Sequence, residues 1–161
     1  MTGMPADIRV LRRDVVPDRR RTAHPEPYAA ARRDRYRRAF GDRLRLSDIR
    51  VHLARLEPGA ATSQRPWHMR EGELVMVLEN EAGRVCDESE TAMPAGRGIG
   101  FLREGVANAH RLVHRGEVAA LVREVATRRP DIDEVPYPDI GLRCRPGRRF
   151  VPRDGTPWER P

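Results

Sequence analysis

Histidine and glutamate side chains in the middle of the chain offer the ligands of a metal site. His68 and Glu73 are five residues apart, so one unbroken strand would direct them to opposite faces of a sheet. A turn through residues 69–72 would instead make them neighbours on adjacent strands, and His110 could approach from a further strand. Two imidazoles and one carboxylate on one side of an ion form the facial arrangement of non-haem Fe(II) oxygenases, and they also suit Zn(II) with a bound water. This pattern predicts chemistry on a small molecule at a divalent metal.

The other histidines are weaker candidates for the same site. His114 follows His110 by four residues, which is about 13 Å along one strand and too far to share an ion. His24 and His52 are assigned no role, because isolated histidines are more often surface residues or hydrogen-bonded core residues. A metal site in this chain therefore has three protein ligands at most.

The basic residues of the chain are all arginine, 31 in a length of 161, and lysine does not occur. The absence of lysine excludes a Schiff-base lysine, a pyridoxal-phosphate enzyme and a phosphate-binding loop that ends in Gly-Lys-Ser or Gly-Lys-Thr. It also weakens any inference from the isoelectric point, because complete use of arginine indicates a compositional bias of the genome. With 39% apolar residues, the chain suits a single domain with one modest core.

The cellular location is predicted from the apolar runs and the cysteines. The longest apolar runs, residues 74–78 and 118–122, are five residues long, whereas a membrane-spanning helix needs about 18 or more. The arginine-rich start lacks the apolar stretch of a secretory signal. Cys86 and Cys144 cannot form a Cys-x-x-Cys metal motif, and they predict reduced thiols that pack as small buried residues. We expect a cytoplasmic protein without membrane contact.

Residues 1–45 are predicted to form an arginine-rich N-terminal arm. The first 50 residues contain 14 arginines and 7 acidic residues, so the whole formal excess of +7 lies there. Arginine suits phosphate, which makes contact of residues 9–45 with nucleic acid one interpretation. Interspersed aspartates and few aromatic residues favour instead an arm that packs over a neighbouring subunit. Residues 28–40 predict a short helix within the arm.

Short β-type runs separated by turn residues begin at residue 46. The predicted strands cover residues 50–56, 73–79, 99–102, 110–114 and 118–125. Their spacing, with no helical block between them, predicts an antiparallel sandwich or barrel over residues 46–126.

Residues 127–161 contain seven prolines and predict an extended tail that wraps the barrel. Tyr137, Ile140, Phe150 and Trp158 are its expected anchors.

The segment around His68 resembles the first motif of the cupin superfamily. That motif reads Gly, five residues, His-x-His, three or four residues, Glu, six residues, Gly. Gly59 matches its first glycine, His68 its second histidine and Glu73 its glutamate. Pro66 stands in place of the first histidine, and Asn80 stands in place of the closing glycine.

Residues 96–114 resemble the second cupin motif: Gly, five residues, Pro-x-Gly, two residues, His, three residues, Asn. Gly96 matches, Leu102 replaces the proline, and three extra residues precede His110, which takes the histidine position. His114 replaces the asparagine. Phrases that flank the motifs also look like those of small single-domain cupins, so the resemblance covers roughly residues 24–158.

The resemblance implies an all-β fold, the cupin jelly-roll β-barrel or double-stranded β-helix. It implies that His68, Glu73 and His110 hold a divalent metal such as iron, zinc, manganese or nickel, and that a small molecule binds inside the barrel. It also implies a homodimer in which arms or edge strands cross between subunits. Cupins include dioxygenases, isomerases and decarboxylases, so the resemblance leaves the reaction and the substrate open.

Two functions other than a metal-dependent enzyme remain open. Loss of the first motif histidine at Pro66 favours a non-catalytic module that binds a sugar or an organic acid beside a decayed metal site. Glu73 would then pair with an arginine such as Arg65 or Arg70, because a buried carboxylate needs a cation beside it. Contact with nucleic acid through the arm is the least favoured function.

Arginines near the motifs are candidates for binding an acidic substrate in the enzyme interpretation. Arg65, Arg103 and Arg111 could orient such a substrate if they face the cavity.

Overall fold

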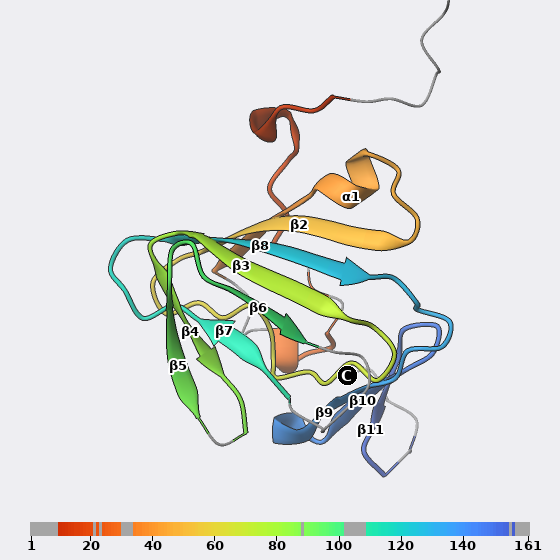
Figure 1. Cartoon of the computed structure of the whole chain (residues 1–161). Coiled ribbons are helices and arrows are strands. Elements are labelled where there is room, and N and C mark those ends of the chain that lie inside the picture. Colours follow the sequence, from red (N-terminus) through yellow and green to blue (C-terminus); the bar gives the residue numbers. More distant parts are fainter. Residues whose placement is uncertain are drawn as a thin grey trace, which may run out of the picture.

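The computed structural model describes residues 10–20, 22, 24–29, 34–87, 89–101, 109–154 and 156. β-strands dominate these residues and form three antiparallel sheets (Figure 1). Among the described residues no helix is both long enough and apolar enough to cross a membrane. The expected all-β fold is confirmed.

A five-stranded sheet forms the larger layer, with the strand order β1-β2-β8-β3-β6. Its strands are β1 (Arg35–Ala39), β2 (Ile49–Leu56), β8 (Ala120–Thr127), β3 (Glu73–Glu79) and β6 (Gly98–Phe101). The strand predicted over residues 73–79 has the observed bounds of β3, and Val75 and Val77 on one face of this strand are buried. The predictions for β2, β6 and β8 are confirmed with ends shifted by one or two residues.

A three-stranded sheet packs against the larger one and has the order β5-β4-β7. It consists of β5 (Glu90–Pro94), β4 (Glu81–Val85) and β7 (Arg111–Val113). Both sheets contribute to one apolar core, to which Leu56 and Val77 belong on one side and Met93 and Leu112 on the other. Leu56 and Val77 have no exposed surface. Two antiparallel sheets around a shared core form the expected jelly roll.

Turn residues of both sequence motifs have left-handed backbone conformations. Gly59 has a φ angle of 82° and Gly96 a φ angle of 87°, which glycine adopts without a steric cost. Asn80, in the place of the motif's closing glycine, has a φ angle of 61°. Asparagine is among the residues that tolerate this conformation best, so the substitution leaves the turn between β3 and β4 intact.

The helix predicted over residues 28–40 is wrong for its second half. Residues Arg35–Ala39 form β1, which pairs with β2 along its whole length, and the one-turn helix α1 (Phe40–Arg43) follows. Hydrogen bonding along the sheet edge therefore outweighs the helix propensity of the alanines before it. Residues 30–33 lie outside the described residues. The boundaries predicted at residues 45 and 126 stay predictions, although β1 extends the sheet before residue 46.

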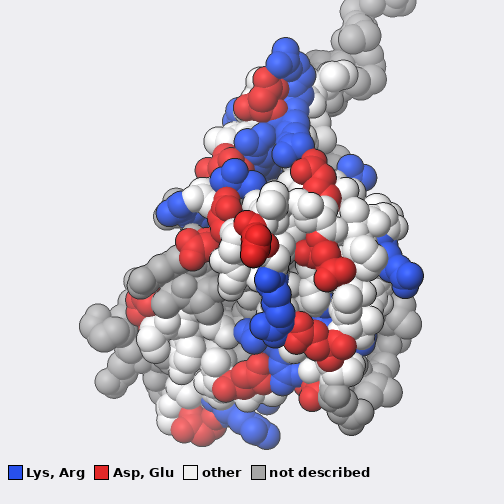
Figure 2. Space-filling model, turned by 90° about the vertical axis from the view of Figure 1, so that its left-hand side faces the viewer, with Lys and Arg blue, Asp and Glu red and all other residues white. Residues whose placement is uncertain are grey.

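The segment before β1 crosses the outer edge of the large sheet. It contains the 3₁₀ helix η1 (Arg13–Val15), and Arg19 forms a β-bridge with Arg37. Arg38 donates a hydrogen bond of 2.9 Å to Asp18. In the view of Figure 2, arginine side chains gather toward the top of the molecule with acidic side chains between them. The arginines of this segment are thus partly neutralised by their neighbours.

The proline-rich tail folds into a third sheet with the order β11-β10-β9. Its elements are β9 (Val135–Tyr137), the 3₁₀ helix η3 (Pro138–Ile140), β10 (Leu142–Arg145) and β11 (Arg149–Pro152). Tyr137, Ile140 and Phe150, which were expected to anchor the tail to the barrel, pack in the tail's own small apolar cluster, and Trp158 lies outside the described residues. The backbone N–H of Trp67 donates to the carbonyl of Pro136 over 3.1 Å. The tail sheet is thereby joined to the segment that carries His68.

Candidate functional site

A cavity of about 420 Å³ is lined by the large sheet, the segment before β3 and the tail sheet. The three predicted metal ligands, His68, Glu73 and His110, all line this cavity. The candidate site is therefore built from segments that are far apart in the sequence.

The ladder of the large sheet arranges the wall of the cavity in rows. One row crosses β2, β8, β3 and β6 and contains Arg50, Ala126, Glu73 and Phe101. The next row contains His52, Glu124, Val75 and Ile99. The third row, with Ala54, Val122 and Val77, belongs to the apolar core. Along the strands the sheet thus changes from charged residues at the cavity to apolar residues in the core over four residues, about 13 Å. The small side chain of Ala126 lies between Arg50 and Glu73 in the first row.

Glu73 and His110 lie beside each other in the cavity. The Oε2 atom of Glu73 is 3.3 Å from the Nε2 atom of His110. The imidazole of His110 stacks on the ring of Phe101, with 3.3 Å between ring centroids and 4° between ring planes. The backbone N–H of His110 donates to the carbonyl of Pro66 over 3.1 Å. Backbone and ring contacts together fix the position of this imidazole.

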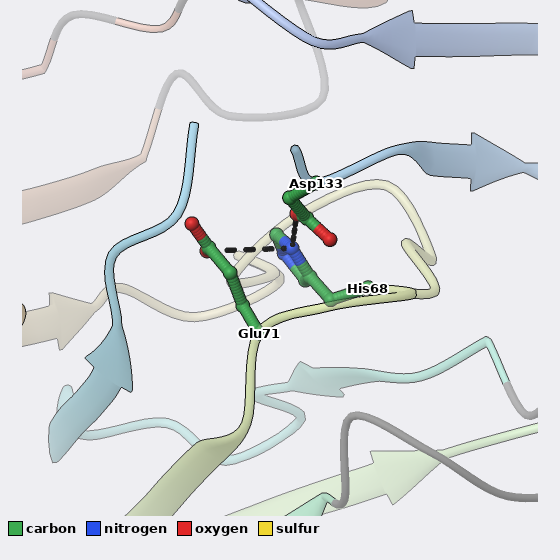
Figure 3. Close-up of side chains that lie close together, drawn as sticks. All are labelled: His68, Glu71 and Asp133. Atoms are coloured by element: carbon green, nitrogen blue, oxygen red, sulfur yellow. Dashed lines mark hydrogen bonds and ion pairs between the residues drawn. The ribbon is translucent and has the colours of Figure 1, made fainter. Parts of the chain in front are cut away.

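His68 contacts two other carboxylates (Figure 3). Its Nδ1 atom is 2.6 Å from Oδ2 of Asp133 and 3.6 Å from Oε2 of Glu71. Glu71 and Asp133 are buried, with side chains 3% and 5% exposed, whereas that of His68 is 18% exposed. Ligand atoms of the three residues lie within 4.8 Å of one another, so this group could also hold a metal.

Protein groups already satisfy the oxygens of these two carboxylates. Oε1 of Glu71 accepts the backbone N–H of Arg129 over 2.6 Å, and Oε2 accepts a hydrogen bond from Arg50. Oδ1 of Asp133 accepts the backbone N–H of Arg70 over 2.8 Å. A metal at Glu71 and Asp133 would have to displace these donors. A carboxylate on one nitrogen of a histidine is instead the usual arrangement when the other nitrogen binds a metal, and for His68 that other nitrogen is Nε2.

Deeper in the cavity, His52 and Glu124 form a second acid–base pair. His52 Nδ1 is 3.6 Å from Oε2 of Glu124, and Arg35 is 3.9 Å from the other carboxylate oxygen. Burial lowers the pKa of His52, the neighbouring Arg37 lowers it further, and Glu124 opposes both effects. Burial raises the pKa of Glu124, but the contacts with His52, Arg35 and Arg37 outweigh it and bring the pKa to about 2. The carboxylate is ionised beside a neutral imidazole.

The charges on the cavity wall do not balance. Each carboxylate that lines the cavity has a basic partner: the pairs are Asp42 with Arg128, Glu71 with Arg50, Glu73 with His110, Glu124 with Arg35 and Asp133 with His68. Four further arginines line the cavity: Arg37, Arg111, Arg145 and Arg148. No carboxylate oxygen of the described residues lies within 4.0 Å of these four guanidinium groups. With neutral histidines, the seven arginines that line the cavity exceed its five carboxylates by two positive charges, and this excess suits an anionic ligand.

The sequence predictions for this region have mixed outcomes. The structure brings Glu73 and His110 into contact and places His68 on the same cavity, but in contact with Glu71 and Asp133. Pairing of Glu73 with Arg65 is wrong, because Arg65 instead pairs with Asp87 at 2.6 Å and with Asp139.

Two of the three arginines proposed for an acidic substrate can be placed. Arg111 lines the cavity, Arg65 is not among the lining residues, and Arg103 lies outside the described residues. Cys86 and Cys144 are buried, as predicted.

Sequence reasoning missed four carboxylate and imidazole residues of the site. Glu71 carried one usable signal, since it lies two residues before Glu73 in the same motif. The register of β2 with β8 would have been needed to pair His52 with Glu124. Asp133 lies in the tail, and no pattern there connects it with His68.

Comparison with solved structures decides the family. The chain is 32% identical to a sugar phosphate isomerase of the cupin superfamily from Silicibacter pomeroyi. The match covers 94% of this chain and 97% of that chain, with a TM-score of 0.86. This chain belongs to the cupin superfamily. The cupin resemblance of the motifs around His68 and His110 is thereby confirmed.

Other solved structures agree with the cupin fold at lower identity. A protein from Acidithiobacillus ferrooxidans is 24% identical, with 79% of this cupin and 81% of that chain covered and a TM-score of 0.68. A polyketide cyclase from Streptomyces resistomycificus is 19% identical, with 74% and 79% covered and a TM-score of 0.60. No protein-family model and no curated protein matches the sequence.

Proposed function

We propose that this cupin is a metal-dependent isomerase of a phosphorylated sugar. The relative from Silicibacter pomeroyi is a sugar phosphate isomerase, and it is similar over nearly the whole chain. One observation on this chain carries the proposal: several arginines on the cavity wall have no carboxylate of the described residues beside them.

The unpaired arginines favour a phosphate group over a neutral sugar. Arg145 ends β10 and Arg148 lies in the turn before β11, so the tail sheet presents two guanidinium groups to one cavity. Arg111 adds a third, and its Nε atom is buried without a hydrogen-bond partner among the described residues. Guanidinium groups bind phosphate through paired hydrogen bonds. We assign the phosphate of the substrate to Arg111, Arg145 and Arg148.

The proposed metal ligands are His68, Glu73 and His110, the residues chosen from the sequence. Glu73 and His110 are already in contact, and Asp133 holds Nδ1 of His68, which keeps the Nε2 atom for a ligand. The donor set of two imidazoles and one carboxylate fits iron, zinc, manganese or nickel. A bound metal would supply a Lewis acid that polarises the oxygens of a sugar.

The second candidate is a non-catalytic cupin that binds a phosphorylated sugar without a metal. Pro66 favours it, because proline cannot replace the missing first histidine as a ligand. Glu73 and His110 would then form a simple charge-assisted pair in the wall. The arginine excess is common to both candidates, so only metal binding and turnover separate them.

Binding of nucleic acid through the arm is less favoured than either candidate. Arg12 pairs with Asp14, Arg38 with Asp18 and Arg19 with Asp42. These contacts compete with phosphate for the guanidinium groups.

We also propose that the protein is a homodimer and lies in the cytoplasm. The mass of the protein in solution tests the homodimer.

The experiment is an isomerase assay on aldose phosphates and ketose phosphates of five and six carbons. Metal-loaded protein is mixed with each sugar, and the aldose and ketose forms are quantified by NMR. The same sugars without phosphate serve as the matched control. Interconversion of at least one phosphorylated sugar, and of none of the unphosphorylated ones, supports the proposal. Unchanged sugar in every sample, with protein that holds its metal, overturns it.

A further inference from the structure

His52 and Glu124 are buried groups that the proposed metal and phosphate sites do not use. They are register partners on β2 and β8, so their side chains lie next to each other on the cavity side of the sheet. Each residue is only 8% exposed, and both line the cavity. Burying two titratable groups at the wall of a cavity is costly, which makes a chemical role worth testing.

The pair lies within reach of a molecule bound at Glu73. In the ladder between β3 and β8, Val75 faces Glu124 and Glu73 faces Ala126. Glu73 and Glu124 are therefore diagonal neighbours, with Cα atoms about 7–8 Å apart. An open-chain sugar is longer than this distance. A substrate held beside Glu73 can thus extend over Ala126 to the imidazole of His52.

Contacts on the imidazole leave one ring nitrogen for the cavity. Glu124 Oε2 and Arg37 Nη1 both face Nδ1 of His52, at 3.6 Å and 3.4 Å. The neighbouring charged groups are Arg37 on β1, Arg50 on β2, Glu124 on β8 and Asp42 on α1. The guanidinium of Arg37 can only donate and would face a lone pair on Nδ1, whereas the ionised carboxylate of Glu124 attracts a proton to the same atom. We assign the proton to Nδ1, which leaves the lone pair on Nε2. This arrangement, an imidazole held by a carboxylate on its far nitrogen, is that of a general base.

The electrostatics agree with this role. Burial and Arg37 lower the pKa of His52, so the ring is neutral near pH 7 and able to accept a proton. Glu124 stays ionised, as its low pKa indicates, and would stabilise the imidazolium once the proton has arrived. Arg37 would favour release of the proton afterwards. The site therefore suits a reversible transfer.

We propose that Nε2 of His52 carries the proton between C2 and C1 of the sugar phosphate, with Glu124 as its positioning residue; this rests on the proposed function. Nε2 takes the proton from C2 of the aldose, the electron pair of the C2–H bond forms the C1–C2 double bond, and the carbonyl pair moves to O1. The O2 proton then passes to O1, and the O2 electron pair forms the C2 carbonyl. The double-bond pair takes the proton from Nε2 onto C1. His52 is restored, and no oxidant or reductant is consumed.

The first test reads the imidazole directly and needs no substrate. ¹⁵N NMR of histidine-labelled protein at pH 7, with His52→Gln used to assign the signal, reports which ring nitrogen carries a proton. We expect a neutral ring with the proton on Nδ1, and the Nε2-protonated form in a fraction that grows in Glu124→Gln. A ring that is cationic at pH 7, or that carries its proton on Nε2 in the wild type, overturns the proposal.

The second test measures proton transfer. For a sugar phosphate that the wild type converts, His52→Gln should lower kcat roughly 10²–10⁴-fold with KM within about threefold, the range lost with a general base. The acidic limb of the pH profile should vanish in the same variant, and thermal unfolding and metal content check its integrity. Folded His52→Gln with wild-type kcat overturns the role of His52 alone. A wild type that converts none of the sugar phosphates overturns the proposed function, and the role of His52 with it.

Discussion

Nδ1 of His68 lies 2.6 Å from Oδ2 of Asp133, although 65 positions separate the two residues in the sequence. The contact joins the segment before β3 to the start of the tail, beside the backbone hydrogen bonds of Trp67 and Met69 with the same part of the tail. The tail thus belongs to the site: it holds the imidazole of one proposed metal ligand and supplies Arg145 and Arg148 to the cavity.

Asp133→Asn should weaken metal binding without removing it. The amide keeps the size of the side chain but loses the charge that fixes the tautomer of His68, and loss of such a partner typically costs 10–100-fold in metal affinity. Competition with a chromophoric chelator measures the affinity. Asp131→Asn, an exposed neighbour two residues away, is the control and should bind metal like the wild type. Equal affinity of Asp133→Asn and wild type would contradict the assignment of Nε2 as the ligand atom.

Replacing the arginines of the tail hairpin should weaken phosphate binding. We expect Arg145→Gln and Arg148→Gln each to raise the Kd of inorganic phosphate roughly 10-fold, since a charge-assisted hydrogen bond contributes about 1.5–3 kcal/mol. Isothermal titration calorimetry provides the measurement. Arg65→Gln is the matched control, because Arg65 pairs with Asp87 and Asp139 away from the cavity. Loss of phosphate binding in the control, or none in the hairpin variants, would show that the phosphate lies elsewhere.

Acid should destabilise the fold in two steps. The pKa of His52 is below its ordinary value of 6.5, so the unfolded chain binds a proton that the folded chain does not, and the free energy of unfolding falls as the pH drops below about 6.5. The pKa of Glu124 falls from 4.5 to about 2, so its contribution is complete above 4.5 and is lost as the pH approaches 2. Urea unfolding at a series of pH values tests both steps. His52→Gln should flatten the first step, and a first step of wild-type size in that variant would refute its assignment.

Replacing leucine by alanine should destabilise the protein more in the shared core than on the outer face of the sheet. Leu56 on β2 has no exposed surface, whereas Leu74 on β3 is 45% exposed on the outer face. We expect Leu56→Ala to lower the free energy of unfolding by about 2–5 kcal/mol and Leu74→Ala by less than about 1 kcal/mol. Chemical denaturation of both variants gives the comparison. Similar losses at the two positions would contradict the packing of the two sheets.

Local patterns predicted much of the fold. The run of apolar residues between two glutamates predicted the bounds of β3 over Glu73–Glu79, and the motif glycines Gly59 and Gly96 occupy left-handed positions. Asn80, at the position of the motif's closing glycine, shows that a residue other than glycine can adopt the same left-handed conformation. By contrast, Arg35–Ala39 forms a strand because it pairs with the edge of β2. Local helix propensity gives no information about such a partner, so this strand could not be predicted.

The candidate site was predictable only where a motif placed its residues. Glu73 and His110 followed from the two cupin motifs and lie in contact. Asp133 and Glu124 reach the cavity through pairings between distant segments, which spacing along one chain does not encode. The excess of arginine in the cavity could not be recognised from the sequence either. An arginine is available to a ligand when no carboxylate is paired with it, and only the structure shows these pairs.

Metal content of the purified protein tests the central claim most directly. We predict close to one divalent ion per chain in the wild type after exposure to Fe(II), Zn(II), Mn(II) or Ni(II), and loss of that ion in Glu73→Ala and His110→Ala. Glu71→Gln, which alters the other carboxylate beside His68, should keep it. A wild type that stays free of all four metals would contradict the account, as would an ion that survives Glu73→Ala and is lost in Glu71→Gln.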